Sequence, residues 1–301
     1  MKRRSLPSRL VVALPYLWLL AFFLAPFAIV VKIGFSQTVI AQPPYRPLLD
    51  LAAGWQGLRD FAAGLSLDAY ALLGSDPLYL LSYLKSLEVA AVSTALLLLI
   101  GYPVAYGMAR APRGLQPLLF MLVVLPFWTS FLIRVYAWIN ILQRDGLLND
   151  LLLALHIIDA PRAWLASDTA IFIGVVYSYL PFMVLPLYAA LEKIDDALLE
   201  AAADLGCPRW RAFWRVTLPL SRPGTAAGAL LCFIPIVGEF VIPDLLGGSR
   251  TQMIGQTLWT EFFSNRDWPV ASAIAVTLLV LLLVPILIYE RLQRRVIEET
   301  A

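Results

Sequence analysis

The chain is poor in charged residues and has almost none of the side chains that build metal or redox sites. Only 15% of its 301 residues are charged, and it contains two cysteines and one histidine. A metal site or catalytic triad would have to be built around the single imidazole of His156, which we expect to lie on the surface. Cys207 and Cys232 show no metal-ligand spacing, and we expect neither to form a disulfide. The sequence therefore predicts no metal site and no catalytic residues.

A nucleotide-binding motif is also missing. No stretch matches the phosphate-binding pattern G-x-x-x-x-G-K-[S/T], and no segment has the composition of a soluble nucleotide-binding domain. We therefore expect no cofactor on this chain, and any ATP and Mg²⁺ that drive its activity should bind to a partner.

Hydrophobic residues, in contrast, make up 60% of the chain, and its mean hydropathy is +0.76. These values are typical of an all-α, multi-pass membrane protein and leave nucleic acid an implausible partner. We expect one transmembrane domain over residues 1–301, in contact with lipid and with six spans. The expected spans lie at about 10–33, 88–109, 115–142, 169–191, 223–246 and 268–289. The first is long enough to cross a bilayer and has no cleavage pattern after it, so we interpret it as an uncleaved span.

The distribution of charge predicts the orientation. Fourteen of the 23 Lys and Arg residues lie in the two terminal segments, in residues 110–116 and in residues 192–222. The positive-inside rule then places both termini and the 192–222 segment in the cytoplasm, and residues 36–84 in the periplasm. The outer connections are acidic on balance. This acidity would concentrate cations near the outer face, or it simply follows from the bias of basic residues toward the other side.

The 192–222 segment has the pattern of two short helices. Asp195 or Asp196 can cap the first helix, Gly206 can end it, and Pro208 suits the first turn of the second. Trp210, Phe213 and Trp214 would share one helical face. Such an amphipathic segment could lie on the membrane surface and bind anionic lipid.

A more specific pattern overlies these helices. Its spacing resembles the signature loop of ABC-importer permeases, at Glu200, Ala201, Ala202, Gly206, Leu218 and Pro219. Val216 stands where that family more often has Ile. The resemblance implies a type I ABC importer permease fold, in which the 192–222 segment couples the permease to an ATPase by docking in a groove on it.

Glu239 is the main candidate for contact with a substrate, because it lies inside the fifth expected span, which it interrupts together with Pro235, Pro243 and Asp244. At 1.5 Å per residue it is about 24 Å from Pro223, in the outer half of the bilayer. A carboxylate at that depth is costly and indicates a functional site. The alternative is a structural ion pair with Arg134, and Glu88 is another possible partner.

Carboxylates and aromatic side chains gather toward the same level of the expected spans. Together they could bind an alkyl-ammonium dication through charge and cation–π attraction. Any single Trp or Tyr could instead belong to the aromatic belt of a membrane protein. The expected substrate path comprises Glu239, Asp244, Glu88, Trp128, Tyr136, Trp138, Tyr177 and Tyr179.

Three stretches in this part of the chain, residues 125–138, 235–248 and 265–273, resemble the permeases of bacterial polyamine importers, most closely the putrescine type. The resemblance implies an inner-membrane heterodimer of two related permeases. It also implies two copies of a cytoplasmic ATPase and a periplasmic polyamine-binding protein. No residue separates putrescine from spermidine on physical grounds.

Three other functions remain open. The chain could be an ABC permease for another cationic or metal-complex solute, an ATP-independent secondary carrier, or a membrane scaffold that transports nothing. A carrier coupled to protons or sodium usually needs ionisable groups at mid-membrane, and this chain has few.

Overall fold

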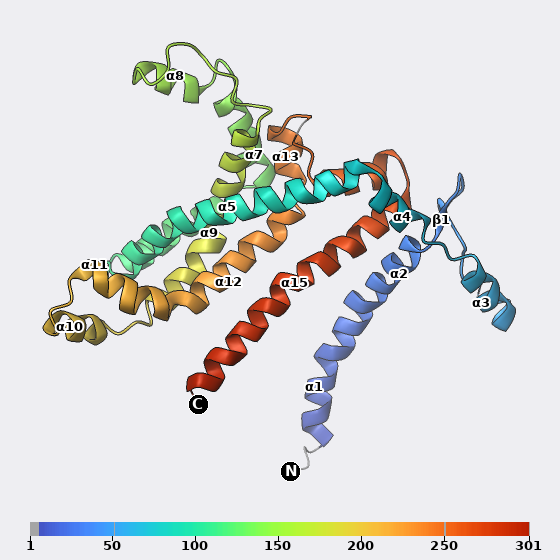
Figure 1. Cartoon of the computed structure of the whole chain (residues 1–301), viewed down its shortest axis with the longest axis horizontal. Helices are drawn as coiled ribbons and strands as arrows, with labels where there is room; N and C mark the ends of the chain where they lie inside the picture. The colour runs from blue at the N-terminus through green and yellow to red at the C-terminus, as the bar shows by residue number, and fades with distance from the viewer. Residues whose placement is uncertain (1–5, 51, 250, 301) are drawn as a thin grey trace. The chain divides into compact units, whose positions relative to one another are not determined.

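The computed structural model describes residues 6–50, 52–249 and 251–300, and this part of the chain is almost entirely helical (Figure 1). Its only strands are β1 (Gln37–Thr38) and β2 (Tyr45–Arg46), which pair antiparallel. The chain divides into two compact units. One comprises Met1–Leu80 and Thr257–Leu281, and the other comprises Leu81–Gln256 and Leu282–Ala301. Each unit is described by itself.

The first unit begins with an apolar helical stretch that includes a π-helical turn. Its elements are α1 (Leu6–Leu19), η1 (Leu20–Leu24), α2 (Ala25–Gly34), β1, β2, α3 (Gly54–Ala63), α4 (Asp68–Ser75), η4 (Thr260–Ser264) and the first part of α15 (Trp268–Thr300). Gly34 lets α2 pack closely, because a Cβ there would lie 2.8 Å from the Tyr70 hydroxyl and 3.3 Å from the Ala273 nitrogen.

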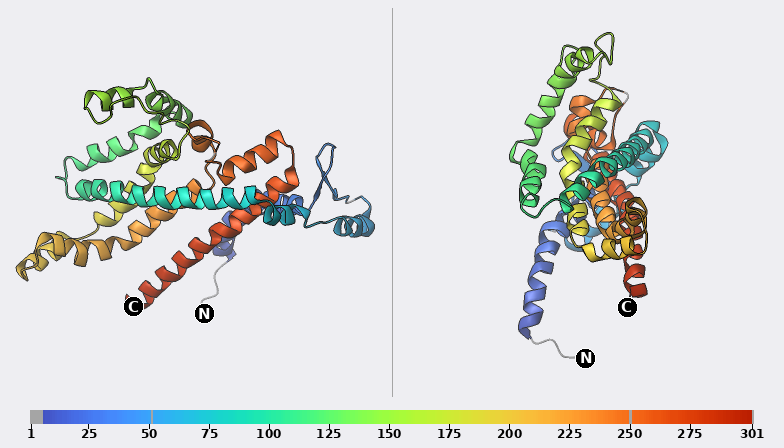
Figure 2. Two further views of the ribbon diagram at one scale, coloured as in Figure 1. Left: turned by 45° about the horizontal axis from the view of Figure 1, so that its top comes forward. Right: turned by 90° about the vertical axis from the view of Figure 1, so that its left-hand side faces the viewer.

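The second unit contains most of the long helices. Its elements are α5 (Pro77–Ala109, entered from the first unit), α6 (Gln116–Val124), η2 (Leu125–Trp128), α7 (Phe131–Leu142), α8 (Leu147–Ala154), α9 (Asp168–Leu191), α10 (Asp196–Asp204), α11 (Arg209–Ala212), η3 (Phe213–Thr217), α12 (Leu218–Val237), α13 (Val241–Leu246) and α14 (Ile254–Trp259, which continues into the first unit). Figure 2 shows the same elements from two further directions.

Helix α5 starts earlier than the span expected at 88–109, and so extends into the segment 36–84 that we assigned to a periplasmic connection. Asp76 and Pro77 explain the early start. The Asp76 carboxylate accepts a hydrogen bond from the Leu78 N–H at 2.8 Å, and Pro77 occupies the first helical position, where its missing N–H has no cost.

Five helical stretches of the described residues are long and apolar enough to cross a membrane, and a sixth is a bent pair. The bent pair consists of Gln116–Trp128 and Phe131–Leu142, whose axes differ by 88°. The span expected at 115–142 is therefore not one straight helix. Pro126 lies in the 3-10 turn η2, and Thr129 and Ser130 adopt extended backbone angles that interrupt the helix.

The span expected at 223–246 is also two helices. Helix α12 begins at Leu218, with Pro219 in its first turn, and ends at Val237; α13 follows after three non-helical residues. The Glu239 carboxylate accepts hydrogen bonds from the N–H groups of Val241 and Ile242, at 3.0 and 3.4 Å. The side chain thus supplies acceptors that a continuous helix would have provided from its own carbonyls.

Helices α9 and α12 pack side by side with their backbones close together (Figure 1). A Cβ at Gly224 would lie 2.4 Å from the Ala190 Cβ and 2.7 Å from the Pro186 carbonyl oxygen. A Cβ at Gly228 would lie 3.1 Å from the carbonyl oxygen of Met183. Small residues at such positions allow close packing of helices in a membrane.

Gly224→Ala should therefore destabilise the protein, whereas Gly107→Ala should not. Gly107 lies in α5 with open space around its Cβ position, so alanine there removes only a helix-weakening residue. At Gly224 the added methyl group overpacks the contact, and we expect a loss of about 1–3 kcal/mol. Thermal unfolding of the two purified variants in detergent measures the difference; equal melting temperatures would contradict the close approach.

Candidate functional site

The 192–222 segment folds as the sequence predicts in its first half. Asp195 is the residue that caps α10, and its carboxylate accepts a hydrogen bond from the Ala197 N–H at 3.0 Å. Gly206 follows the helix with φ of +74°, a conformation that glycine adopts without strain. Pro208 directly precedes α11 instead of lying inside it.

No residue of α10 is buried. Glu200 and Ala201 are exposed, and so is Gly206 beyond the helix, whereas Ala202, Leu218 and Pro219 are partly covered. Large apolar side chains around the motif are open to solvent as well, including Leu205 at 88% exposure and Trp210 at 63%. An amphipathic segment that nothing in its own unit covers is a surface for a partner or for lipid.

The three aromatic residues of this segment do not share one face. Trp210 and Trp214 are exposed, whereas Phe213 packs inward, edge-on to the rings of Tyr102 and Tyr106 at centroid distances of 5.6 and 5.8 Å. The expectation of a common face is wrong because Phe213 and Trp214 are consecutive, and consecutive residues of a helix point about 100° apart.

The C-terminal end of α5 holds the 192–222 segment through two contacts. Arg110, one residue beyond α5, forms an ion pair with Asp196 in the first turn of α10. The Tyr102 hydroxyl is 2.7 Å from the Ser221 hydroxyl on α12. Neither contact is visible in the sequence, because the partners are 86 and 119 residues apart.

Glu239 lies in the break between α12 and α13 and is 9% exposed. Its second carboxylate oxygen accepts a hydrogen bond from the Tyr179 hydroxyl on α9 at 2.7 Å. Arg134 does not pair with it: neither residue takes part in an ion pair within the described part of the chain. The alternative of an Arg134–Glu239 bridge is therefore wrong for this fold.

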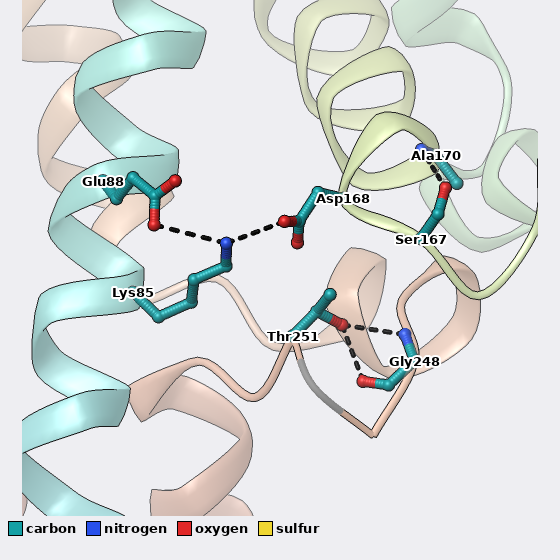
Figure 3. Close-up of polar contacts among 7 residues, drawn as sticks. All are labelled: Lys85, Glu88, Ser167, Asp168, Ala170, Gly248 and Thr251. Atoms are coloured by element: carbon teal, nitrogen blue, oxygen red, sulfur yellow. Dashed lines mark hydrogen bonds and ion pairs between the residues drawn. The ribbon is translucent and has the colours of Figure 1, made fainter.

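Glu88 is not the partner of Glu239 either (Figure 3). It pairs with Lys85 at 3.2 Å, and the same ammonium group pairs with Asp168 at 2.9 Å. Asp168 lies in the first turn of α9, where a carboxylate also interacts favourably with the helix dipole. Lys85 thus pairs with both carboxylates and joins α5 to α9, and the trio keeps one net negative charge.

The other expected path residues do not converge on Glu239. Trp128 and Tyr136 are 72% and 53% exposed, and Asp244 is exposed on α13. Trp138 packs edge-on against Tyr177, with ring centroids 5.4 Å apart. Of the eight residues, the structure brings Tyr179 to Glu239 and Trp138 to Tyr177.

A hollow of about 810 Å³ lies between η2, α7, α9 and α12. Aromatic rings and the apolar side chains of α12 between Ala227 and Pro235 form its walls, and Arg134 is its one charged lining residue. The aromatic lining consists of Phe127, Phe131, Tyr179 and Phe182. Sequence reasoning missed the hollow because its walls come from three separate stretches.

Residues 8–298 match a family described as the binding-protein-dependent transport system inner membrane component. The chain belongs to this family. As a permease subunit of an ABC importer it is not an enzyme, and the ATPase of such a transporter is a separate subunit.

Three relatives within the family show how its members vary. The spermidine/putrescine transport system permease protein PotB of Haemophilus influenzae is 39% identical over 284 residues, covering 94% of this chain and 93% of the relative. PotB of Escherichia coli K12 is 42% identical over 229 residues, covering 76% and 83%. The molybdenum transport system permease protein ModB of Mycobacterium bovis is 32% identical over 209 residues, covering 68% and 75%.

Solved structures show the same fold. A bacterial ABC transporter that imports the acidic polysaccharide alginate has a chain that matches with a TM-score of 0.69 at 18% identity, covering 96% of both chains. The methionine ABC transporter MetNI in an inward-facing conformation matches with a TM-score of 0.56 at 19% identity, covering 74% of this chain and 99% of the other. The all-α fold of a type I ABC importer permease is thereby confirmed.

The Arg110–Asp196 pair should matter for transport more than for stability. The Asp196 side chain is 75% exposed, so Asp196→Arg should alter the free energy of unfolding by less than about 1 kcal/mol, whereas Arg110 is 22% exposed and its change should cost more. Arg110→Glu and Asp196→Arg should each lower ATP-driven uptake several-fold by loosening the 192–222 segment, and the double variant should recover it. Uptake by cells with matched protein levels measures this, with Arg113→Glu in the same connection as control. Uptake that the single changes leave intact would rule out the role.

Proposed function

We propose that this chain is a subunit of an importer that moves a polyamine, putrescine first, from the periplasm to the cytoplasm. The observation that carries the proposal is the 39% identity, along nearly the whole chain, to a permease named for spermidine and putrescine. That name covers both polyamines, so the preference for putrescine rests on the sequence resemblance. In this proposal both termini and the 192–222 segment face the cytoplasm, in agreement with their basic charge.

The geometry around Glu239 suits an ammonium group. A carboxylate offers about four acceptor positions, and Tyr179, Val241 and Ile242 use three of them. One acceptor position and the negative charge remain for a cation, and the ring of Tyr179 beside the carboxylate can cover part of the methylene chain. The low exposure of Glu239 makes such a contact stronger than it would be in water.

The exposed motif of α10 supports docking on a partner ATPase. That partner, and not this chain, would bind ATP and Mg²⁺. We propose two copies of that ATPase, a second related permease and a periplasmic polyamine-binding protein. An alginate transporter of the same fold was solved in complex with a periplasmic protein loaded with an alginate pentasaccharide. ATP binding would move the 192–222 segment, and the spans would rock between outward- and inward-open arrangements.

A permease for another cationic or metal-complex solute is the second candidate, because a relative at 32% identity is named for molybdenum. Competition of unlabelled solutes with labelled putrescine for uptake distinguishes these two candidate functions. An ATP-independent carrier would need the ion gradient instead of ATP.

Uptake of labelled putrescine and spermidine tests the proposal in a strain that lacks this chain. The wild-type chain should restore putrescine uptake, and an uncoupler should spare that uptake while ATP is maintained. Glu200→Lys should abolish it with the protein still in the membrane, because the change reverses a charge on the exposed docking helix. Lys193→Glu, exposed just before α10, is the control. Prompt arrest by the uncoupler would favour a carrier, and full uptake by Glu200→Lys would remove the ATPase-coupled proposal.

Glu239→Gln should raise the KM for putrescine by about 10-fold to 100-fold. The amide keeps the size and one acceptor but loses the charge, and a hydrogen bond to a charged group contributes about 1.5–3 kcal/mol. Tyr179→Phe removes one bond to the carboxylate and keeps its charge, so its KM should change less than tenfold. If Glu239 only stabilises the break, both variants should instead lose protein stability with KM unchanged.

A further inference from the structure

The hollow described above contains polar groups that lack partners. Nε and Nη1 of Arg134 and the hydroxyl of Ser178 are shielded from solvent and make no hydrogen bond within the described residues. The guanidinium carbon lies 5.8 Å from the ring centroids of both Phe127 and Phe131. Cation–π attraction of this kind offsets only part of the cost of burying a charge. Nε and Nη1 of Arg134 therefore require an acceptor that the described residues do not supply.

A carboxylate on an apolar surface fits this hollow best. The guanidinium offers parallel N–H groups that match a carboxylate, and the remaining walls are aromatic and aliphatic. The proposed cargo cannot serve, because a polyamine is a cation and the guanidinium repels it.

The position of the hollow along α12 favours a protein helix over a lipid headgroup. Ala227 and Pro235 are about 14 and 26 Å along the helix from Leu218, at 1.5 Å per residue. A hydrocarbon core about 30 Å thick that begins between Leu218 and Pro223 would contain the hollow, and phosphate headgroups would lie outside it. Only a membrane-spanning segment brings a carboxylate to that level at acceptable cost.

We propose that a membrane-spanning helix of the second permease subunit packs into this hollow and pairs an Asp or Glu with Arg134. The proposal rests on the proposed function, which supplies that subunit. A second copy of this chain fits the hollow less well, because a two-fold symmetric contact would place the same surface of each copy against the other. Two such hollows would bring two guanidinium groups together, because Arg134 is the one charged residue that lines each of them.

Photocrosslinking in the intact complex tests which molecule fills the hollow. The photoreactive residue p-benzoylphenylalanine replaces Phe131 in the hollow or, as control, Leu99, which is 72% exposed on α5. Position 131 should give an adduct with the second permease subunit, mapped by mass spectrometry to an apolar segment containing Asp or Glu. Adducts with lipid alone, or with a second copy of this chain, would overturn the proposal.

A charge exchange tests the pairing itself. Arg134→Glu should reduce the second permease that copurifies with this chain at least fivefold, and changing the mapped acid to Arg should restore it. Arg134→Met, which fills the apolar hollow without charge, should also lower the yield if pairing holds the subunits together. Arg144→Glu, at an exposed position, is the control.

The outcomes separate the two proposals. The pairing alone is overturned if Arg134→Met copurifies as much second permease as the wild-type chain does and the exchanged pair shows no recovery. Uptake and assembly would then be intact, and the proposed function would stand. A wild-type chain that purifies without any ATPase or second permease, and that restores no uptake, would overturn the proposed function and the pairing with it.

Discussion

The close approach of α9 and α12 is the constraint on which the second unit depends. Gly224 and Gly228 bring the α12 backbone against Pro186 and Met183 of α9. In a membrane, apolar side chains gain little by leaving lipid for protein, so such backbone-to-backbone packing is a main source of helix association. Because this contact fixes the two helices against each other, it also fixes the wall of the hollow and places Tyr179 opposite Glu239.

A second constraint follows from the break after α12. Non-helical backbone within a membrane is tolerated only where its polar groups find partners inside the protein. Glu239 provides them for the N–H groups of Val241 and Ile242, and Tyr179 stabilises the same carboxylate from α9. One side chain can therefore have a structural and a functional role. A carboxylate that is needed to satisfy the backbone is also held at a depth where an ammonium group would find it.

The sequence predicted the helices well and their interruptions poorly. Long apolar runs locate helices such as α9, and local signals such as Asp195 and Gly206 mark the ends of α10. Pro235, Glu239, Pro243 and Asp244 mark the fifth expected span as interrupted, but hydropathy cannot show that Glu239 replaces backbone acceptors there. It also cannot show that Arg134 faces α9 and α12, which are far from it in the sequence, nor that Lys85 pairs with Glu88. Within the candidate site, residues were predictable one at a time, while their partners depended on tertiary packing.

The continuity of α12 has a consequence for how transport would be driven. The helix runs without interruption from Leu218, beside the proposed docking motif, to Val237, beside Glu239. A movement of the 192–222 segment would therefore reach the Glu239 region over about 30 Å through one rigid element. Residues 238–240 follow at the far end, outside any helix, and can absorb backbone rotation that α12 cannot.

Movement of α12 would change the position of the Glu239 backbone relative to Tyr179 only if α9 did not follow. The glycine-mediated contact makes α9 follow, so the opening should occur between this helix pair and its neighbours instead of within it.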